Sequence, residues 1–405
     1  MKNDESLYSS YKEALEELKS KSSFREIKDI KQDGKYIILN NASAGLKTGC
    51  ACMSKKLLNF SSNDYLGISS NNTLRNDFLQ EYLKSGSKIS NPSARLLCGT
   101  DSIYKELEEF LAKIFNKERA LIFNSGYHGN VGVYSSLLSA DDIVFVDRLN
   151  HASIIDGIRL SKAKIIPYAH LNYEDLKQKL IKYRRSYKKA IISSESLFSM
   201  DGDIADINKL ADLKEEFNAL LIIDEAHSFG VYGGGIGICK EQNALDRVDL
   251  LLATFGKAVG SYGAFVAGNE ILIDYLINFA RSFIFSTTLP EISVAFSYYA
   301  LKNLILKDNI LQDKLFNLNS YLRNNLKTFD IMGESYIAPV LIGENSNAVG
   351  LSNLLIENGF YILPIRYPTV AKNTARLRIS LNSGFETADI KSLVDFLNTI
   401  PSQAI

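Results

Sequence analysis

Short apolar segments alternate with amphipathic segments through the middle of the chain. The apolar segments predicted as strands are residues 120–123, 143–147, 164–168, 190–194, 220–224 and 248–255. The segments between them place apolar residues at helical spacing, most clearly at 172–185 and 206–217. Because short buried strands that alternate with helices are typical of α/β folds, the pattern predicts a mostly parallel sheet covered on both faces, with 263–268 as an additional strand.

The pattern changes after Pro290, where two longer helical segments are predicted at 291–308 and 311–329. A smaller alternation follows, with strand-like segments at 336–343, 361–365 and 376–381 and helical segments at 349–359 and 387–400. We therefore expect three parts: an N-terminal helix and arm at 1–60, a large domain at 61–290, and linking helices with a small α+β domain at 291–405.

Composition and charge narrow the classes of function. Hydrophobic residues make up 46% of the 405 residues, which is enough for a main domain and a smaller one. Lys+Arg and Asp+Glu both number 46, and the net charge of zero argues against nucleic acid or an anionic membrane surface as a partner. The N-terminal segment lacks the apolar run of a signal peptide, and no stretch has the roughly 20 apolar residues of a membrane span. We expect a cytoplasmic protein.

The chain has four cysteines, of which Cys50 and Cys52 form a close pair. Their spacing differs from that of a zinc knuckle, and no second pair or nearby histidine completes a metal site. We therefore expect no bound metal, and reduced thiols in a cytosolic protein. The surrounding stretch, 41–56, has no assigned role.

Polar residues suited to chemistry follow several of the predicted strands. Asp224 closes the strand 220–224, Lys257 follows 248–255, and His151 follows 143–147. All four histidines of the chain lie within residues 128–227. Because ligands of α/β sheets bind at the carboxyl ends of the strands, these residues predict one site at one edge of the sheet.

Three kinds of site can be built from these residues, and they differ in how much they explain. A metal site could use Asp224 and His227, but no HExxH or comparable ligand pair accompanies them. A dinucleotide site could use the glycines at 232–237, but they lack the GxGxxG spacing, and a flexible turn is the simpler interpretation. A site that holds an aldehyde cofactor covalently through Lys257 accounts for more residues than the other two.

Pyridoxal phosphate needs a set of groups that this chain can supply one by one. The amine of Lys257 can hold its aldehyde, and the carboxylate of Asp224 can keep its ring nitrogen protonated, which makes the ring an electron sink. Backbone amides at a helix N-terminus can bind its phosphate, and Gly126 and Tyr127 begin a predicted helix. The further candidate contacts are Ser199, Thr254 and His151. Each residue alone has an ordinary structural explanation, whereas their joint occurrence favours this cofactor.

Eight motifs occur in a recognisable order along the chain. They are NFSSNDYLG (59–67), FNSGYHGN (123–130), NHASIIDG (150–157), FSMDGD (198–203), DEAHSFG (224–230), TFGKAVG (254–260), IFSTTLP (284–290) and PTVAKNTARLRISL (368–381). From about residue 57 to the C-terminus, the chain resembles the α-oxoamine synthases, a family of fold-type I pyridoxal phosphate enzymes. The resemblance implies a large α/β domain with a mostly parallel sheet, a small C-terminal α+β domain, and a homodimer with its sites at the interface.

The resemblance also implies roles for individual residues. Lys257 would bind the cofactor and later move the α-proton of the substrate, Asp224 would pair with the ring nitrogen, and His227 would hydrogen-bond the ring oxygen. His151 would stack on the ring and assist the thioester carbonyl, and Ser199 and Thr254 would support the cofactor. The remaining matches are Asn63 and Arg378 for the amino-acid carboxylate, Arg25 and Thr369 for the acyl substrate, and Ser286 and Thr287 for phosphate contacts donated by a partner subunit.

The implied reaction is a decarboxylative condensation of an amino acid with an acyl thioester of coenzyme A or of an acyl carrier protein. The stretches TFGK, SYGAF (261–265) and RYPTVAKNTARLR (366–378) resemble the branch that joins L-alanine to a pimeloyl group. RLLCGT (95–100) and the stretch 150–164 resemble the branch that joins glycine to acetyl-CoA, and SNPSAR (90–95) departs from the glycine-rich run of many members. A branch that joins serine to a long acyl chain, and a non-catalytic partner subunit that lacks the lysine, are further alternatives.

Overall fold

The computed structural model describes residues 4–21, 23–39 and 55–401. Contacts divide the chain into two compact units. The large unit comprises 63–199 and 203–314, and the small unit comprises 1–62, 200–202 and 315–405. This division groups the N-terminal arm with the C-terminal segment, and the domain bounds expected from the sequence stay a prediction. Cys50 and Cys52 lie outside the described residues, as does most of the stretch 41–56.

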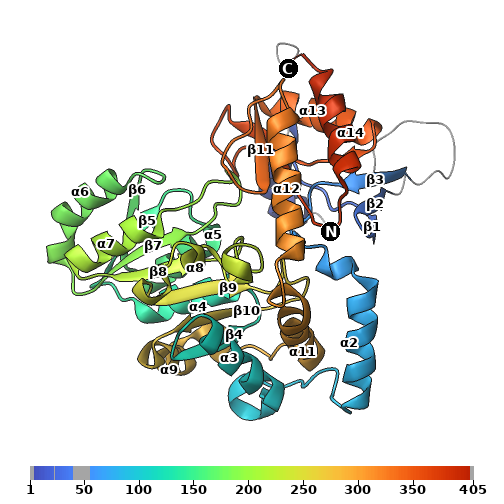
Figure 1. The fold of residues 1–405 in the computed structure, drawn as a ribbon. Helices are drawn as coiled ribbons and strands as arrows, with labels where there is room; N and C mark the ends of the chain where they lie inside the picture. The colour runs from blue at the N-terminus through green and yellow to red at the C-terminus, as the bar shows by residue number, and fades with distance from the viewer. Residues whose placement is uncertain (1–3, 22, 40–54, 402–405) are drawn as a thin grey trace. The chain divides into compact units, whose positions relative to one another are not determined.

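A seven-stranded sheet in the order β4-β10-β9-β8-β7-β5-β6 organises the large unit (Figure 1). Its strands are β4 (Arg119–Phe123), β5 (Ile143–Asp147), β6 (Lys164–Tyr168), β7 (Ala190–Glu195), β8 (Leu220–Asp224), β9 (Leu250–Thr254) and β10 (Ala264–Gly268). Strand β10 is antiparallel to both neighbours, and the other pairs are parallel. The prediction of a mostly parallel sheet is confirmed. Because strands such as β5 and β9 are buried on both faces, their sequences are continuous apolar runs.

Helices follow most of these strands. In the large unit they are α2 (Asn72–Lys84), α3 (Ser102–Ile114), α4 (Gly126–Leu137), α5 (Ala152–Ser161), α6 (Tyr173–Tyr183), α7 (Ile207–Phe217), α8 (Ile238–Glu241), α9 (Glu270–Phe279), α10 (Arg281–Ile284) and α11 (Glu291–Ala300). Side chains cap several of their first turns, as Ser125 does for α4 and Asn172 for α6. Helix α12 (Ile310–Asn325) crosses the boundary between the two units.

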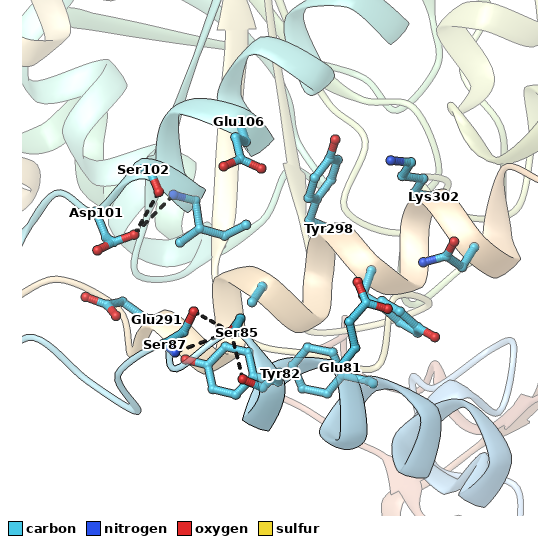
Figure 2. A pocket seen from close by; sticks show the side chains of 15 residues that line it. Glu81, Tyr82, Ser85, Ser87, Asp101, Ser102, Glu106, Glu291, Tyr298 and Lys302 are labelled. Atoms are coloured by element: carbon cyan, nitrogen blue, oxygen red, sulfur yellow. Dashed lines mark hydrogen bonds between the residues drawn. The ribbon is translucent and has the colours of Figure 1, made fainter.

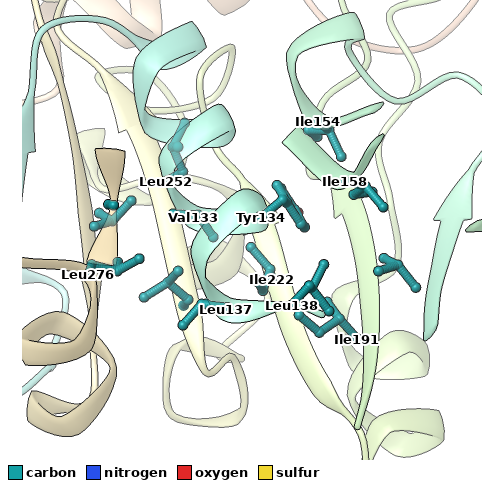
Figure 3. Close-up of a cluster of buried hydrophobic side chains, with 14 of the residues drawn as sticks. Val133, Tyr134, Leu137, Leu138, Ile154, Ile158, Ile191, Ile222, Leu252 and Leu276 are labelled. Atoms are coloured by element: carbon teal, nitrogen blue, oxygen red, sulfur yellow. The ribbon is translucent and has the colours of Figure 1, made fainter. Parts of the chain in front are cut away.

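A hydrophobic cluster packs helices α4, α5 and α9 against the sheet (Figure 3). Val133 of α4 and Ile158 of α5 are almost fully buried in it, together with Leu252 of β9. Helix α5 approaches α4 closely at Gly157, where a Cβ would lie only 2.8 Å from the carbonyl oxygen of Asn130. This packing fixes the two helices whose first turns carry candidate site residues.

The described part of the small unit contains two sheets. One sheet has the order β1-β2-β3-β12 and the other β11-β14-β13. The strands are β1 (Ile30–Asp33), β2 (Tyr36–Leu39), β3 (Lys55–Asn59), β11 (Ile337–Gly343), β12 (Phe360–Tyr361), β13 (Pro364–Ile365) and β14 (Ala375–Ser380). Its helices include α1 (Asp4–Ser20), α13 (Asn345–Glu357) and α14 (Thr387–Asn398), together with the part of α12 from Leu315 onward. No helix in the described ranges is long and apolar enough to cross a membrane.

Two predicted elements differ from the structure. The strand expected at 361–365 is split between the sheets: β12 pairs with β3, and β13 pairs with β14. Pro364 has no N–H to donate, so one continuous ladder through this segment is disfavoured. The helix expected at 291–308 ends as α11 at Ala300 and continues as a π-turn over Leu301–Ile305. The spacing of apolar residues alone does not show where an α-helix changes to a π-helix.

Candidate active site

Six parallel strands end at one edge of the large unit's sheet. Their last residues are Phe123, Asp147, Tyr168, Glu195, Asp224 and Thr254. Lys257 follows β9 directly, and His151 follows β5 at the start of α5. The candidate residues His151, Asp224 and Lys257, which span more than a hundred positions of the sequence, therefore lie at one carboxyl edge of the sheet.

The Asp224 carboxylate is buried and held from two sides. Its Oδ1 accepts a hydrogen bond from the backbone N–H of Ala226 at 2.9 Å, and its Oδ2 accepts one from Nδ2 of Asn130 at 2.8 Å. Asn130 also donates to Oγ of Ser153 at 3.0 Å, and that hydroxyl lies 2.7 Å from Nδ1 of His151. The sequence points to Asp224 and His151, the two ends of this network. It does not single out Asn130, which it shows only as part of the motif 123–130.

The charges of Asp224 and Lys257 both act on the imidazole of His151. Withdrawal from water lowers the pKa of His151, the Asp224 carboxylate raises it, and the Lys257 ammonium lowers it. His151 also caps α5, because its Nδ1 accepts from the backbone N–H of Ser153 at 3.2 Å. The cap fixes the imidazole next to the strand ends, where the residue is partly buried and keeps an exposed surface. It can therefore stack on a flat ligand.

Glu195, the last residue of β7, is a buried acid that the sequence does not single out. It stands opposite Asp224 in the register of β7 and β8. Burial raises the pKa of the Glu195 carboxyl well above its usual value, and Asp224 raises it further, whereas Lys257 lowers it. Because two adjacent buried carboxylates do not readily ionise together, the arrangement favours the neutral form of Glu195.

Helix α4 begins just after the end of β4. Its N-cap is Ser125, whose Oγ accepts from the backbone N–H of His128 at 3.2 Å. A Cβ placed on Gly126 would lie 4.0 Å from Cβ of Thr254, so the first turn of α4 lies beside the end of β9. The free N–H groups of this turn, which includes Tyr127, can bind an anionic group such as a phosphate.

His227 follows β8 and is buried. Its Nδ1 lies 2.7 Å from the hydroxyl of Tyr65, which donates to Oδ1 of Asn63 at 3.0 Å. With the Tyr65 proton directed to Asn63, Nδ1–H of His227 donates to the Tyr65 oxygen, and Nε2 of a neutral ring is then the acceptor. Tyr65 therefore connects two expected contact residues, although the sequence shows it only as part of the motif 59–67.

Three hydroxyl residues of the expected site lie in loops. Ser199 lies in the turn after β7, where the N–H of Phe198 donates to the carbonyl of Asp203 at 3.0 Å. The carbonyl of Thr287 accepts from Nδ2 of Asn124 at 2.7 Å, beside the start of α4 in the same chain. Thr287 is exposed and Ser286 is partly exposed. Their expected contact across a subunit interface stays a prediction.

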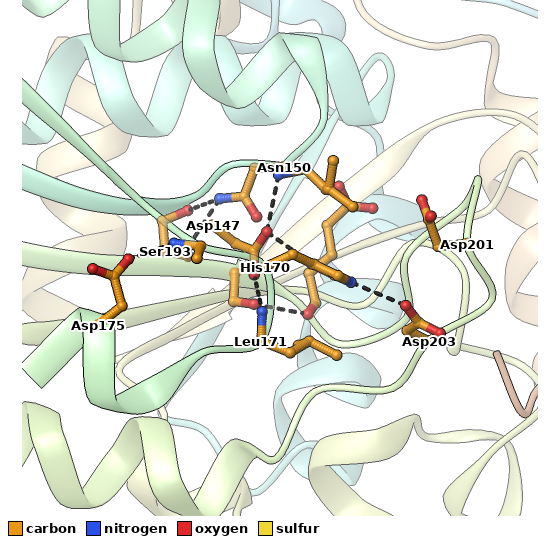
Figure 4. Close-up of polar contacts among 12 residues, drawn as sticks. Asp147, Asn150, His170, Leu171, Asp175, Ser193, Asp201 and Asp203 are labelled. Atoms are coloured by element: carbon orange, nitrogen blue, oxygen red, sulfur yellow. Dashed lines mark hydrogen bonds and ion pairs between the residues drawn. The ribbon is translucent and has the colours of Figure 1, made fainter. Parts of the chain in front are cut away.

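His170, which follows β6, has a structural role: its ring lies between two carboxylates. Its Nδ1 lies 2.9 Å from Oδ1 of Asp147, and its Nε2 lies 3.1 Å from Oδ2 of Asp203 (Figure 4). Burial lowers the pKa of His170, but hydrogen bonds and charge from the two carboxylates outweigh burial and raise the pKa to about 9. The charged ring therefore ties the loop after β7 to the end of β5.

The glycines at 232–237 belong to a turn that packs on a buried carboxylate. Glu225 is fully buried and accepts from the backbone N–H groups of Ile238 at 3.0 Å and Cys239 at 2.7 Å. Gly237 has a φ of 124°, and a Cβ there would lie 2.6 Å from Oε2 of Glu225. The contact with Glu225 therefore defines the conformation of this turn. The sequence alone favours a flexible turn.

In the small unit, the structure brings Arg25 and Thr369 together. Nη2 of Arg25 donates to Oγ1 of Thr369 at 3.2 Å, and both are expected contacts of the acyl substrate. Arg378 is buried on β14 and donates to Oγ of Ser380 at 2.7 Å. Arg376, on the same face of β14, forms an ion pair of 2.6 Å with Asp201 and so supports the fold. The two arginines of this strand therefore have different surroundings.

A separate cavity of about 450 Å³ lies among α2, α3 and α11 (Figure 2). Its lining includes the carboxylates of Glu81, Asp101, Glu106 and Glu291, and the lysine Lys302. Oε1 of Glu291 is buried without a hydrogen-bond partner. None of the residues expected to bind the cofactor or a substrate lines this cavity.

The donor set of the strand edge fits pyridoxal phosphate. It offers a partly buried lysine amine at Lys257, a buried and oriented carboxylate at Asp224, an accessible imidazole at His151, and a capped helix N-terminus with Gly126 in its first turn. Among the residues that the structure describes, no group of three or more His, Cys, Asp or Glu side chains is placed to hold a metal ion.

Comparison with known sequences gives a family match and relatives of nearly the same length. The family described as aminotransferase class I and II matches residues 55–397. Relatives from Haemophilus influenzae and Neisseria meningitidis serogroup C are 41% and 40% identical, over 94% of this chain and 98% of each relative. Both relatives carry the provisional name 8-amino-7-oxononanoate synthase.

Solved structures give a consistent result for the fold. The 8-amino-7-oxononanoate synthase from Francisella tularensis is 30% identical, with a TM-score of 0.72, over 85% of this chain and 97% of that one. The serine palmitoyltransferase from Sphingomonas wittichii is 24% identical, with a TM-score of 0.84, over 98% of this chain and 97% of that one. The expected fold class is confirmed, and at this identity the second likeness concerns the fold alone.

Proposed function

We propose that this chain, which belongs to the class I and II aminotransferase family, catalyses the pyridoxal-phosphate-dependent condensation of L-alanine with a pimeloyl thioester. The products are 8-amino-7-oxononanoate, carbon dioxide and the free thiol, a step of biotin biosynthesis. The observation that carries the proposal is the position of Lys257 directly after β9, at the same strand edge as Asp224 and His151. The choice of substrates is supported by the names of the relatives at 40–41% identity.

The residues proposed to hold the cofactor come from the strand edge. Lys257 would attach it covalently, the Asp224 carboxylate would pair with its ring nitrogen, and His227 would hydrogen-bond its ring oxygen. The further proposed contacts are Gly126, Tyr127, His151, Ser199, Thr254, Ser286 and Thr287. When bound, the cofactor supplies an electron sink for negative charge at the α-carbon of the amino acid.

The proton movements fall to Lys257. The amino group of L-alanine would replace Lys257 as the cofactor's partner, and the freed Nζ would take the α-proton, so that the α-carbon can form a bond to the carbonyl carbon of the thioester. The carbon–sulfur bond breaks, and the thiol leaves with a proton. The bond to the carboxylate breaks with loss of carbon dioxide, and Nζ of Lys257 returns a proton to the α-carbon. His151, with its lowered pKa, is proposed to assist at the carbonyl oxygen of the thioester.

Four residues are proposed to hold the two substrates. Asn63 and Arg378 would bind the carboxylate of the amino acid, and guanidinium groups suit this task because they match carboxylate geometry. Thr369 and Arg25 would contact the acyl substrate, and their mutual hydrogen bond is consistent with a shared ligand. Coenzyme A and an acyl carrier protein are both possible carriers of the pimeloyl group.

A homodimer in the cytoplasm is part of the proposal. An antiparallel bridge between Ala94 and Thr287 joins two surface segments that carry exposed apolar side chains. Leu97, three residues after Ala94, is 81% exposed, and Phe285, two residues before Thr287, is 70% exposed. Because apolar clusters of this kind usually mark an interface, they support a second subunit on this face, where Ser286 and Thr287 could reach the partner's cofactor.

One assay tests the proposed reaction and its alternatives together. The purified enzyme with pyridoxal phosphate is offered glycine, L-alanine and L-serine, each with acetyl, succinyl, pimeloyl and palmitoyl thioesters, and thiol release is followed. The proposal expects a clear preference for L-alanine with the pimeloyl donor. A preference for glycine with acetyl-CoA, or for L-serine with the palmitoyl donor, would replace it by the corresponding alternative.

A further inference from the structure

The cavity of about 450 Å³ among α2, α3 and α11 lies wholly within the large unit (Figure 2). A space of this size suits a small organic ligand. Each of the three helices contributes a carboxylate to the lining: Glu81 lies on α2, Glu106 on α3, and Glu291 in the first turn of α11. Asp101, the N-cap of α3, adds a fourth. The proposed reaction uses none of these residues, and the cavity therefore needs an explanation of its own.

Negative charge predominates around this cavity. Among the lining residues that the structure describes, Lys302 is the one cation against four carboxylates, and its ammonium lies 5.6 Å from the centre of the Tyr298 ring. The carboxylates also act on a tyrosine, because burial raises the pKa of Tyr82 and the charges of Glu291 and Asp101 raise it further. A region with this excess of acidic charge is stabilised by a bound cation.

Glu291 is the buried member of this acidic group. The residue is 2% exposed, and its Oε1 is buried without a hydrogen-bond partner. Burial and the charge of Asp101 raise the pKa of the Glu291 carboxyl, whereas the charge and the backbone N–H of Lys88 lower it. A buried carboxylate oxygen without a donor is unfavourable. Because Glu291 lines the cavity, a ligand with N–H groups bound there would supply the missing donor.

Aromatic rings make up much of the remaining wall. Phe78, Tyr82, Tyr298 and Tyr299 all line the cavity, and the ring centres of Phe78 and Tyr299 lie 5.5 Å apart. Such rings attract ammonium groups through their faces, and they also pack against methylene groups. In the part of the chain that the structure describes, no three acidic, histidine or cysteine side chains are placed to hold a metal ion. The carboxylates are therefore better matched by a ligand whose positive charges are spaced along a chain.

We propose that this cavity binds a linear organic cation with at least two ammonium groups, a diamine or polyamine, with Glu291 as its buried contact. The exposed carboxylates of Glu81 and Glu106 are the further partners. Ammonium groups match the carboxylates, and the methylene segments between them match the aromatic wall. A compact metal ion matches only the charge. This site is separate from the proposed condensation and does not depend on it.

Calorimetric titration of the holoenzyme tests the site directly. The probes are spermidine, n-butylamine, which has one ammonium group, and Mg²⁺. The variants are Glu291→Gln and the double variant Glu81→Gln/Glu106→Gln, which changes only exposed residues and so should fold. Glu109→Gln is the matched control, because Glu109 is exposed on α3 but lies outside the cavity lining. Thermal unfolding of each variant without amine verifies the fold.

Spermidine should bind saturably, with one molecule per chain, to the unmodified enzyme and to Glu109→Gln. We expect its Kd to rise about tenfold or more in Glu291→Gln and about threefold to tenfold in the double variant, because exposed charges are screened by solvent. n-Butylamine should bind more weakly than spermidine. An unchanged Kd in either variant overturns the proposal. Displacement of spermidine by Mg²⁺ that binds in its place would assign the cavity to a metal ion and also overturn it.

Thermal unfolding with the amine gives a second measurement. Because a ligand that binds the folded chain stabilises it, spermidine should raise the Tm of the unmodified enzyme and of Glu109→Gln, and at the same concentration leave that of Glu291→Gln nearly unchanged. An equal rise in all three proteins would show that spermidine acts elsewhere on the surface. Absence of saturable binding to the unmodified enzyme below about 1 mM would reject the site. Neither measurement involves turnover, so failure of the site leaves the proposed function untouched.

Discussion

Nδ2 of Asn130 donates a hydrogen bond of 2.8 Å to Oδ2 of Asp224, and both residues are buried. Asn130 lies on α4, the helix whose first turn is proposed to bind phosphate, and Asp224 closes β8. The contact therefore fixes the carboxylate relative to the helix. Since the other oxygen of Asp224 is held by the N–H of Ala226, the side chain has one defined orientation. We regard Asn130 as a positioning residue that acts through Asp224.

Replacing Asn130 by Ala should weaken cofactor binding. The change leaves Oδ2 of Asp224 without this donor, which costs about 1–3 kcal/mol for a buried group. We expect the Kd for pyridoxal phosphate to rise about tenfold or more, measured by titration of its absorbance. Asn278→Ala, the same change at an exposed position of α9, is the control. Unchanged affinity in Asn130→Ala would show that Asp224 needs no such support.

Glu195 offers a prediction about protonation. Because burial and Asp224 raise the pKa of its carboxyl, the neutral acid is favoured, and Gln is its closest neutral mimic. Glu195→Gln should therefore keep most of the stability, whereas Glu195→Ala should lose about 1–3 kcal/mol from unpaired groups and a cavity. Denaturant unfolding of both variants measures the difference. Equal losses in the two variants would mean that Glu195 acts as a carboxylate.

His170 should make stability depend on pH. Its pKa rises from 6.5 to about 9 in the folded chain, so its contribution is fully present below pH 6.5 and is lost as the pH rises through about 9. After allowance for solvent screening, about 1–2 kcal/mol is expected. The difference in unfolding free energy between the unmodified protein and His170→Gln should be largest near pH 6 and vanish above pH 9. A difference independent of pH would contradict a charged ring.

Shared sites in a dimer predict complementation between inactive variants. Lys257→Ala and the double variant Ser286→Ala/Thr287→Ala should each be inactive, because each lacks part of every site. After mixing and subunit exchange, hybrid dimers have one intact site, so about a quarter of full activity should return. Each variant incubated alone is the control. A protein that is monomeric by light scattering and fully active at the assay concentration would exclude shared sites.

Much of the fold follows from local patterns. Buried parallel strands must be apolar along their length, and so β5, β7, β8 and β9 stand out in the sequence. Lys257 and Asp224 stand out for the same reason, since a charged residue at the end of an apolar run is conspicuous. The division of 361–365 between two sheets is different, because it depends on which strands are neighbours in space.

The supporting residues of the site needed the structure. Asn130 meets Asp224 only because α4 packs against the sheet, and Glu195 meets Asp224 only because β7 and β8 are adjacent. Tyr65 reaches His227 across 162 positions of the chain. Ordinary residue types at ordinary positions carry no sign of such pairings, nor of the acidic lining of the cavity around Glu291.

The central claim is that Lys257 holds the cofactor. The holoenzyme is reduced with borohydride and digested, and its peptides are analysed by mass spectrometry, with Lys257→Ala and the exposed Lys240→Ala treated in parallel. We predict a cofactor-derived mass on the peptide that contains Lys257 in the unmodified enzyme and in Lys240→Ala, and no such adduct or turnover in Lys257→Ala. A label on another lysine of the unmodified enzyme, or undiminished turnover in Lys257→Ala, would contradict the account.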